Sequence, residues 1–300
     1  MPTRSRATAL WVKETFKQNR SMLSWMVPPD GLTAAGTTDR GADRVIKTWY
    51  RILHLGLLIA AGAAPAEAAT AAQVVHVRLS MSNVYLLKGA RGPVLVDSGS
   101  KNEMAPLVAA LAEEGVRIED LRAVILTHGH ADHAGLAAEI RRRSGAVLIA
   151  GRGDRLMMAA GVNDPVTPTG LFARLILMFP LDARYEPFSA DIEVDTELDL
   201  SVYGLAGRAL PMPGHTPGSL VVVLDDGRAF VGDMILGGWL GGALFPHRAG
   251  EHYFHQNVAQ NHANIVALAK RPIRQYFLGH GGPVSAQSVR ENFALGAVVH

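Results

Sequence analysis

The 300-residue sequence contains no cysteine, which excludes disulfides, thiolate metal ligands and cysteine nucleophiles. It also contains no G-x-S-x-G nucleophile turn and no G-x-x-x-x-G-K-[ST] phosphate-binding loop. Any metal ion must therefore be held by histidine, carboxylate or water. Hydrophobic residues make up 48% of the chain and charged residues 19%, which excludes a disordered protein.

The net charge of +2 is unevenly distributed. Residues 1–51 carry nine Lys or Arg and four Asp or Glu, whereas the remainder carries 20 basic and 23 acidic residues. Because the remainder has no basic excess, we expect a small-molecule substrate and no nucleic-acid partner.

Residues 45–68 are typical of a secretory signal peptide. Two basic residues precede a 13-residue, largely apolar run, and Ala66-Glu67-Ala68 fits a small-x-small cleavage site. The run is too short for a stable membrane span, so no permanent anchor is expected. A core helix or an interfacial anchor is the alternative. We expect an exported protein, periplasmic or secreted, that is cleaved near residue 68. Residues 1–44 are then a disordered extension or precede the true start.

Residues 69–300 are expected to form one domain in which short strands alternate with helices. Residues 154–190, rich in Leu, Met, Phe and Pro, are predicted to be a helical insertion or lid. Short strands mixed with helices favour two sheets covered by helices. The predicted strands are Val74–Leu79, Asn83–Leu87, Pro93–Asp97, Ala123–Leu126, Ala146–Ala150 and Ile273–Leu278, with others within Val194–Leu210 and Ser219–Val231. The predicted helices are Glu103–Glu114, Asp132–Arg143 and Asn257–Lys270.

The stretch THGHADHAG, residues 127–135, follows an apolar strand and precedes a predicted helix. His128 and His130 are two residues apart, so in an extended segment they face the same side and suit one metal ion. Asp132 and His133 lie at the start of the helix and suit a second ion. A single loop histidine is usually a solvated surface residue, but this pattern after a buried strand favours metal binding.

One motif cannot complete two metal sites, so further ligands must come from elsewhere. Three loops that follow apolar strands offer them: MPGHTPGSL with His215, FVGDMILGG with Asp233, and FLGHGGP with His280. Each has glycine beside the ligand, which permits close backbone approach. Taken alone, each of these three residues could equally be a metal ligand or an ordinary loop residue. Together they supply what a two-metal centre requires.

The order of these residues resembles that of the metallo-β-lactamase fold superfamily over roughly residues 74–290. The resemblance implies an α/β fold, namely an αβ/βα four-layer sandwich with the metals at one edge of its two sheets. It implies two zinc ions, with Mn²⁺ or Fe²⁺ as alternatives. One zinc ion would be held by His128, His130 and His215. The other would be held by Asp132, His133 and His280, with Asp233 and a hydroxide bridging the two ions.

The resemblance also implies roles for two aspartates. Asp132 would orient the nucleophilic hydroxide, which two adjacent ions generate at neutral pH. Asp97, in VDSGS, matches a position that supports the ligands from behind; a turn or cap aspartate is the alternative. These roles indicate metal-assisted hydrolysis.

The identity of residue 233 bears on the substrate. In the family, true β-lactamases generally carry cysteine or serine there, whereas glyoxalase II, N-acyl homoserine lactonases and phosphodiesterases keep aspartate. Asp233 therefore favours an ester, lactone, thioester or phosphodiester. Only 20 residues follow His280, so the glutathione-binding domain of glyoxalase II is not expected. The tyrosine that follows the aspartate in lactonases is absent from MILGGWLGG, and family nucleases are cytosolic, which conflicts with export.

Two apolar stretches are expected to shape the pocket and to favour a substrate with an acyl chain. One is a lid helix with Phe172 and Phe179, for which a core helix is the alternative; the other contains Trp239 and Phe245. No ligand role is assigned to the nearby His247, His252 and His255, because seven positions already complete two sites.

Three other functions remain open. The first is a periplasmic metallo-β-lactamase, which export favours. The second is an iron-dependent oxidoreductase of the same fold, similar to persulfide dioxygenases. The third is a binding protein without catalysis, against which the full ligand set argues.

Overall fold

The computed structural model describes residues 71–80, 82–179 and 182–293. The segment for which the sequence predicts a signal peptide lies outside these residues. None of the helices in these ranges combines the length and the hydropathy that a membrane span requires.

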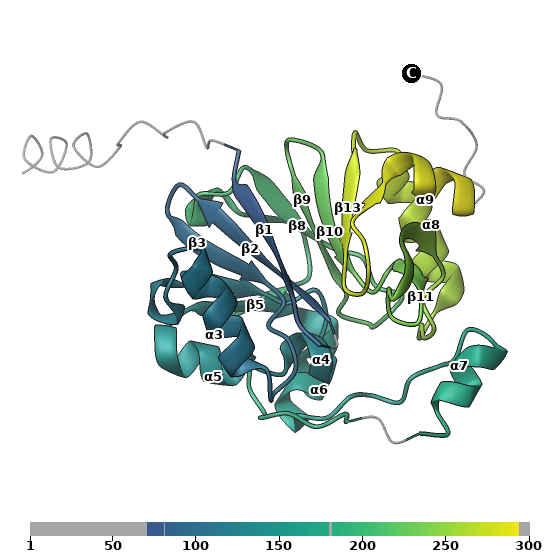
Figure 1. Cartoon of the computed structure of the whole chain (residues 1–300), viewed down its shortest axis with the longest axis horizontal. Helices are drawn as coiled ribbons and strands as arrows, with labels where there is room; N and C mark the ends of the chain where they lie inside the picture. The colour runs from purple at the N-terminus through teal and green to yellow at the C-terminus, as the bar shows by residue number, and fades with distance from the viewer. Residues whose placement is uncertain (1–70, 81, 180–181, 294–300) are drawn as a thin grey trace, which may run out of the picture. The chain divides into compact units, whose positions relative to one another are not determined.

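Two six-stranded sheets form the centre of the fold (Figure 1). In the first sheet, β1, β2 and β3 are antiparallel neighbours, and β3 to β6 run parallel. Its strands, in spatial order, are β1 (Gln73–Arg78), β2 (Asn83–Gly89), β3 (Gly92–Val96), β4 (Ala123–Ile125), β5 (Val147–Gly151) and β6 (Ile192–Val194). The short buried β4 carries the histidine-rich loop at its carboxyl end, beside β3 and β5.

The second sheet is antiparallel except for the parallel pair β10 and β13. Its strands, in spatial order, are β14 (Val284–Ser285), β13 (Gln275–Leu278), β10 (Arg228–Gly232), β9 (Leu220–Leu224), β8 (Gly207–Pro211) and β7 (Leu198–Asp199). A separate hairpin pairs β11 (Leu236–Trp239) with β12 (Leu244–Gly250).

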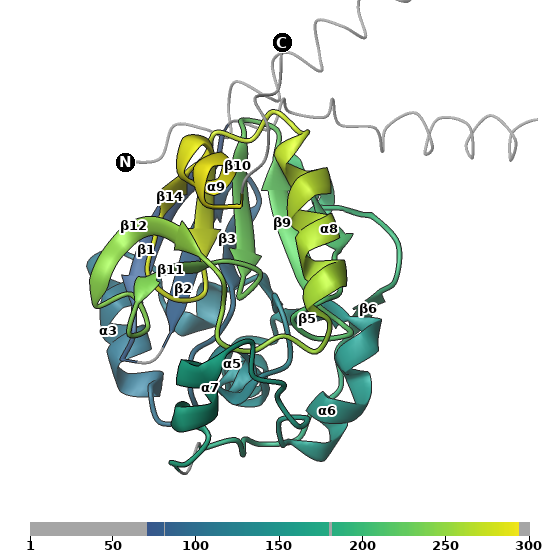
Figure 2. The same cartoon turned by 90° about the vertical axis from the view of Figure 1, so that its right-hand side faces the viewer.

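Helices cover the outer face of each sheet (Figures 1 and 2). On the first sheet these are α3 (Met104–Glu113) and α5 (Ala137–Ser144), and on the second they are α8 (Val258–Ala269) and α9 (Ala286–Asn292). Shorter helices are α4 (Ala131–Ala134), α6 (Arg155–Ala160) and α7 (Leu171–Ile176). Single 3₁₀ turns lie at Ile118–Asp120, Arg152–Asp154 and Ser201–Tyr203.

Alternating side chains place hydrophobic layers on both faces of the sheets. In β2, Val84 and Leu86 pack toward α3 and α5, whereas Tyr85 and Leu87 pack between the sheets. In β10, Phe230 joins the layer between the sheets, and its neighbours join the layer under α8 and α9. This period of two, with both faces buried, is expected for strands covered on each side. The predicted αβ/βα four-layer sandwich is confirmed.

The single helix predicted over Asp132–Arg143 is wrong, because the chain forms α4 and α5 with a break at Gly135 and Leu136. A Cβ at Gly135 would lie 2.6 Å from the backbone nitrogen of Lys101, so the close approach requires glycine. Glycine weakens a helix because its backbone loses more conformational freedom on ordering.

Two helices with different surroundings lie between β5 and β6. Helix α6 buries Met157 and Met158, and Met158 joins the core beside α5. Helix α7 lies at the end of a longer excursion (Figure 1), and its Leu171 is 75% exposed. Phe179, predicted to lie in the same helix, follows its end and is 72% exposed. The first part of the segment therefore packs into the domain, and the second part projects from it.

Candidate metal centre

The histidine-rich loop begins where β4 ends. His130 is the N-cap of α4, and Asp132 and His133 lie in that helix. His128, His130 and His133 are buried, whereas Asp132 is partly exposed. The loop thus directs its side chains into a largely closed centre with Asp132 at its accessible side.

The remaining predicted ligands come from the second sheet. His215 lies between β8 and β9, and Asp233 follows β10 directly. His280 follows β13, which pairs in parallel with β10. Because β10 and β13 are parallel neighbours, their carboxyl ends present Asp233 and His280 side by side. The structure therefore brings all seven predicted ligands to one centre, and their metal binding stays a prediction.

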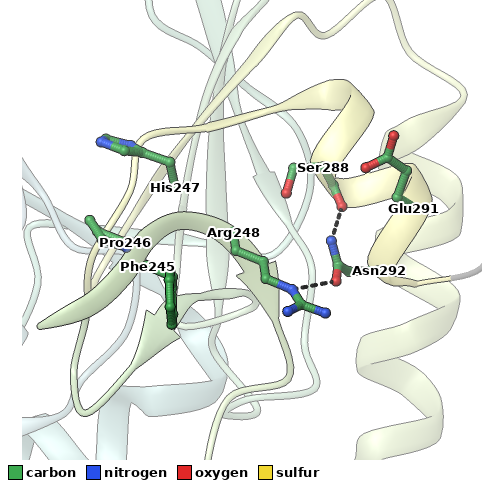
Figure 3. Close-up of a pocket in the computed structure, with 7 residues that line it drawn as sticks. All are labelled: Phe245, Pro246, His247, Arg248, Ser288, Glu291 and Asn292. Atoms are coloured by element: carbon green, nitrogen blue, oxygen red, sulfur yellow. Dashed lines mark hydrogen bonds between the residues drawn. The ribbon is translucent and has the colours of Figure 1, made fainter.

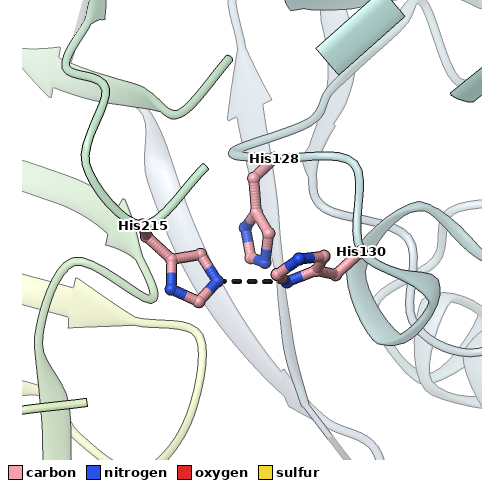
Figure 4. A group of neighbouring side chains, drawn as sticks. All are labelled: His128, His130 and His215. Carbon is pink, nitrogen blue, oxygen red and sulfur yellow. Dashed lines mark hydrogen bonds between the residues drawn. The ribbon is translucent and has the colours of Figure 1, made fainter. Parts of the chain in front are cut away.

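A first group contains only histidines (Figure 4). The potential ligand atoms of His128, His130 and His215 all lie within 4.8 Å of one another. Nε2 of His215 lies 3.1 Å from Nδ1 of His130. Figure 4 shows the three rings, from two separate loops, turned toward a common point. Three convergent imidazoles are a donor set that suits a divalent ion.

A second group, within the same 4.8 Å limit, contains Asp132, His133 and His280. Nε2 of His280 lies 3.2 Å from Oδ2 of Asp132, and Nε2 of His133 lies 3.5 Å from the same oxygen. Asp132 gives this group a carboxylate donor, which the first group lacks.

Asp233 lies between the two groups. Its Oδ2 is 3.8 Å from Nε2 of His128 and 3.7 Å from Nε2 of His215. The same oxygen is 3.3 Å from Nε2 of His280, and Oδ1 is 3.4 Å from Nε2 of His133. A carboxylate placed between two donor sets can be shared by two ions.

Hydrogen bonds fix the orientation of two of the imidazoles, those of His133 and His215. Oδ2 of Asp97 lies 2.9 Å from Nδ1 of His133, which is where the resemblance expects a supporting carboxylate. Nδ1 of His215 lies 2.8 Å from the carbonyl of Phe254. Each contact holds one ring nitrogen and leaves Nε2 directed into the centre, as is usual for metal-binding histidines.

Asp154 joins the two loops that carry the first group. Its Oδ2 accepts a hydrogen bond from the backbone N–H of Gly129, at 2.8 Å, and one from the hydroxyl of Thr216, also at 2.8 Å. Its Oδ1 accepts one from the backbone N–H of Gly218 at 2.7 Å. Gly129 separates His128 from His130, so this carboxylate positions both loops. Nothing in the local sequence around Asp154 indicates this role.

The electrostatics of the two groups differ. Burial lowers the pKa of His128 and His215 well below the ordinary value, and it also lowers that of His130. These three imidazoles are therefore neutral and can offer a lone pair. Burial also acts on His280, but Asp233 and Asp132 outweigh it and raise its pKa to about 10. The carboxylates thus stabilise positive charge at this side of the centre.

Two buried polar atoms without hydrogen-bond partners indicate that a metal ion fits this centre. Among the described residues, Nε2 of His128 and Oδ1 of Asp233 have no hydrogen-bond partner. Leaving such atoms unpaired costs roughly 1–3 kcal/mol each. Coordination to a cation would satisfy both, and imidazole and carboxylate suit borderline divalent ions. The residues present fit a metal centre.

His252, for which the sequence predicts no ligand role, also belongs to the cluster. Its ligand atom lies within 4.8 Å of those of His215 and Asp233, and all three side chains are buried. Neither of the other two histidines left without a role belongs to such a group within the described part of the chain.

The four predicted pocket residues lie in different surroundings. Phe172 contacts the ring of Tyr253, with centroids 5.4 Å apart, whereas Phe179 and Trp239 are mainly exposed. Phe245 lines a surface hollow of about 660 Å³ between β12 and α9 (Figure 3). The residues that line this hollow include none of the seven predicted ligands. Contact of these four side chains with a substrate stays a prediction.

The fold and the clustered donors together define an α/β sandwich protein with a centre suited to metal ions. The family model described as the metallo-beta-lactamase superfamily matches residues 77–280. The chain therefore belongs to the metallo-β-lactamase superfamily.

Proteins of similar sequence include a hydroxyacylglutathione hydrolase and a probable metallo-hydrolase. The chain is 32% identical over 157 residues to a hydroxyacylglutathione hydrolase of Anaeromyxobacter dehalogenans, a match that covers 52% of this chain and 46% of that protein. It is 32% identical over 178 residues to a probable metallo-hydrolase of Bacillus subtilis, with 55% and 66% covered. The chain thus matches about half to two thirds of the length of these relatives.

Solved structures of similar fold include a metallo-beta-lactamase family protein of Thermus thermophilus. It has a TM-score of 0.52 and 23% identity, and the match covers 74% of this chain and 77% of that one. A subclass B3 metallo-beta-lactamase of Bradyrhizobium japonicum has a TM-score of 0.50 and 20% identity, with 70% and 75% covered. These likenesses support the fold alone.

Proposed function

We propose that this protein is a two-zinc hydrolase that cleaves an activated acyl bond in a small molecule with an apolar part. The bond would be an ester, a lactone or a thioester. The observation that carries the proposal is the position of Asp233, within 3.3–3.8 Å of donors from both groups. A bound pair of divalent ions would supply hydroxide at neutral pH and stabilise negative charge on the attacked carbonyl oxygen.

The residues of this chain have distinct parts in such a reaction. The buried histidines would hold the ions in a site shielded from water, and Asp233 would be shared between them. Asp132 is the more exposed carboxylate of the centre, so it can orient the attacking oxygen from the accessible side. Asp97 holds His133 in the orientation that keeps its Nε2 directed inward.

Apolar side chains near the centre support a substrate with an apolar part. The ring of Phe172, in α7, packs against Tyr253, and the backbone N–H of Leu240 donates to the Tyr253 hydroxyl at 2.8 Å. Two apolar segments distant in sequence therefore meet beside His252, which lies in the cluster. The acyl chain of a substrate bound along this surface would remain close to the reacting centre.

A hydrolysis assay tests this function. The zinc-loaded protein is given lactones and thioesters of increasing acyl length, a phosphodiester, a penicillin and a carbapenem. We expect kcat/KM to be highest for the acyl substrates and to rise by up to about fourfold per added CH₂, which corresponds to about 0.8 kcal/mol. A penicillin or carbapenem cleaved orders of magnitude faster than any ester or lactone would contradict the proposal.

A pair of variants locates the apolar contact. Phe172→Ala should flatten the dependence on acyl length, because it removes a side chain beside Tyr253. Leu156→Ala, which changes a side chain that is 73% exposed on α6, is the matched control and should leave the dependence unchanged. An unchanged slope in the Phe172 variant would place the acyl chain elsewhere.

The competing function of another class is an iron-dependent oxidoreductase. Metal analysis distinguishes it, because one iron ion with oxygen uptake indicates oxidation, whereas two zinc ions indicate hydrolysis.

A further inference from the structure

His252 follows β12 and is buried directly beside the central carboxylate. Its Nε2 lies 3.2 Å from Oδ2 of Asp233. His280, a predicted ligand, approaches the carboxylates in the same way, at 3.2 Å from Asp132 and 3.3 Å from Asp233. His252 therefore has the same relationship to Asp233 as a histidine that is expected to bind metal.

One backbone carbonyl orients both His252 and His215. The carbonyl oxygen of Phe254 lies 2.8 Å from Nδ1 of His215 and 3.2 Å from Nδ1 of His252. An Nδ1–H that donates to a carbonyl leaves Nε2 with a free lone pair, which is the usual arrangement behind a metal-binding imidazole. The two rings lie nearly perpendicular, with centroids 4.9 Å apart, and both direct Nε2 at Asp233.

The favourable environment of Nε2 in buried His252 depends on which ring nitrogen carries the proton. If Nδ1 carries the proton, two lone pairs face each other at 3.2 Å, on Nε2 of His252 and Oδ2 of Asp233. A cation between them converts that repulsion into two favourable contacts. The other possibility is that Nε2–H donates to Asp233, with the Phe254 backbone N–H, 3.3 Å away, donating to Nδ1.

We propose that His252 is an eighth metal-binding side chain, which binds an ion together with His215 and Asp233. This set shares His215 with the three-histidine group, so both sets describe the same side of the centre. An ion held there has His252 as an additional nitrogen donor. The inference rests on the metal-dependent hydrolase proposed above, but its tests measure metal binding and not turnover, so either can fail without the other.

The first test compares two glutamine variants of the full chain by competition for zinc with a chromogenic chelator. In His252→Gln, the amide can still donate a hydrogen bond to Asp233, but it is a poor nitrogen ligand. We expect this variant to bind at least one zinc ion about tenfold or more weakly, since even residues behind the ligands contribute that much. His247→Gln is the matched control, because His247 is exposed and its Nδ1 contacts the carbonyl of Pro283. Zinc affinity in His252→Gln equal to that of the wild type would overturn the proposal.

The second test needs no variant and therefore does not depend on its folding. Long-range ¹H–¹⁵N NMR of the zinc-loaded wild-type protein identifies the protonated nitrogen of each imidazole. We expect His252 to carry its proton on Nδ1, with the Nε2 resonance at the position of a metal-bound nitrogen. A proton on Nε2 would show that His252 only donates to Asp233, and it would rule out the metal ligand.

Discussion

Oδ2 of Asp97 lies 2.9 Å from Nδ1 of His133, and both side chains are buried. The other oxygen of Asp97 accepts a hydrogen bond from the backbone N–H of Thr127 at 2.7 Å. One carboxylate therefore connects the end of β3 to the start of the histidine-rich loop. Asp97 also has a φ of 63°, a conformation that an L residue adopts at a cost and that is often found at functional sites.

Asp97→Asn should weaken metal binding by about 10–100-fold, because the neutral amide polarises and holds His133 less strongly. Competition with a chelator measures the change. Asp120→Asn, which alters an exposed ion pair with Arg117, is the control and should have no effect on metal affinity. Equal affinities in the two variants would show that the Asp97 contact does not support the centre.

Asp233→Ala should lower metal content and turnover more than any substitution of a residue that only supports the ligands from behind. The substitution removes the carboxylate shared by both donor groups, so we expect loss of one metal ion and a fall in kcat of at least about 10²-fold. Asp225→Ala, in the exposed turn between β9 and β10, serves as the control. Elemental analysis and turnover of the two variants are compared. Full metal content and turnover in the Asp233 variant would mean that another residue bridges the ions.

Asp154 should give the free energy of unfolding a measurable pH dependence. Burial raises the pKa of this carboxyl to about 6, against a partial opposing effect from the hydrogen bonds of Thr216, Gly129 and Gly218. A folded pKa above the unfolded one means that the folded state binds the proton more tightly. Its contribution to stability is therefore complete below about pH 4 and is lost as pH rises to about 6, by up to about 3 kcal/mol.

The Asp154→Asn variant cannot titrate, so it should lack this pH dependence. Chemical denaturation at several pH values between about 4 and 7, with the same metal content, gives the difference between wild type and variant. We expect the advantage of the wild type to shrink as pH rises through this range. A difference that stays constant with pH would show that Asp154 is not protonated in the folded protein near pH 5.

Export can be tested on the N-terminus, and we propose that the protein is cleaved near residue 68. Two basic residues, a short apolar run and Ala66-Glu67-Ala68 carry this proposal. N-terminal sequencing of protein from the periplasmic fraction should find the mature chain starting close to that residue. Recovery of the uncleaved chain from the cytoplasm would contradict export.

The strands, and the residues that converge at the candidate metal centre, were predictable because their signals are local. β1 and β2 lie within one or two residues of the predicted segments, since short apolar runs bounded by turn residues indicate them. His215, Asp233 and His280 were recognisable because each follows an apolar strand and lies beside glycine. Loops that follow parallel strands of one sheet lie at the same edge of that sheet. A residue just after such a strand can therefore be placed at that edge from the sequence.

Two residues of the centre had no such signal. His247, His252 and His255 lie within nine residues, and only the contact of His252 with Asp233 distinguishes it from its neighbours. Asp154 lies in a 3₁₀ turn after β5, and its role depends on Gly218, 64 residues away. The break between α4 and α5 likewise depends on the approach of Lys101 to Gly135. Each of these features is determined by tertiary packing, which the local sequence does not encode.

Metal stoichiometry tests the two-metal centre most directly. The purified protein is exposed to excess zinc, freed of loosely bound ions and analysed for metal per chain, with folding monitored by circular dichroism. The convergence of the first and second donor groups on Asp233 predicts about two equivalents of zinc per folded chain. A fully folded protein that retains no divalent metal would contradict the proposed two-metal centre.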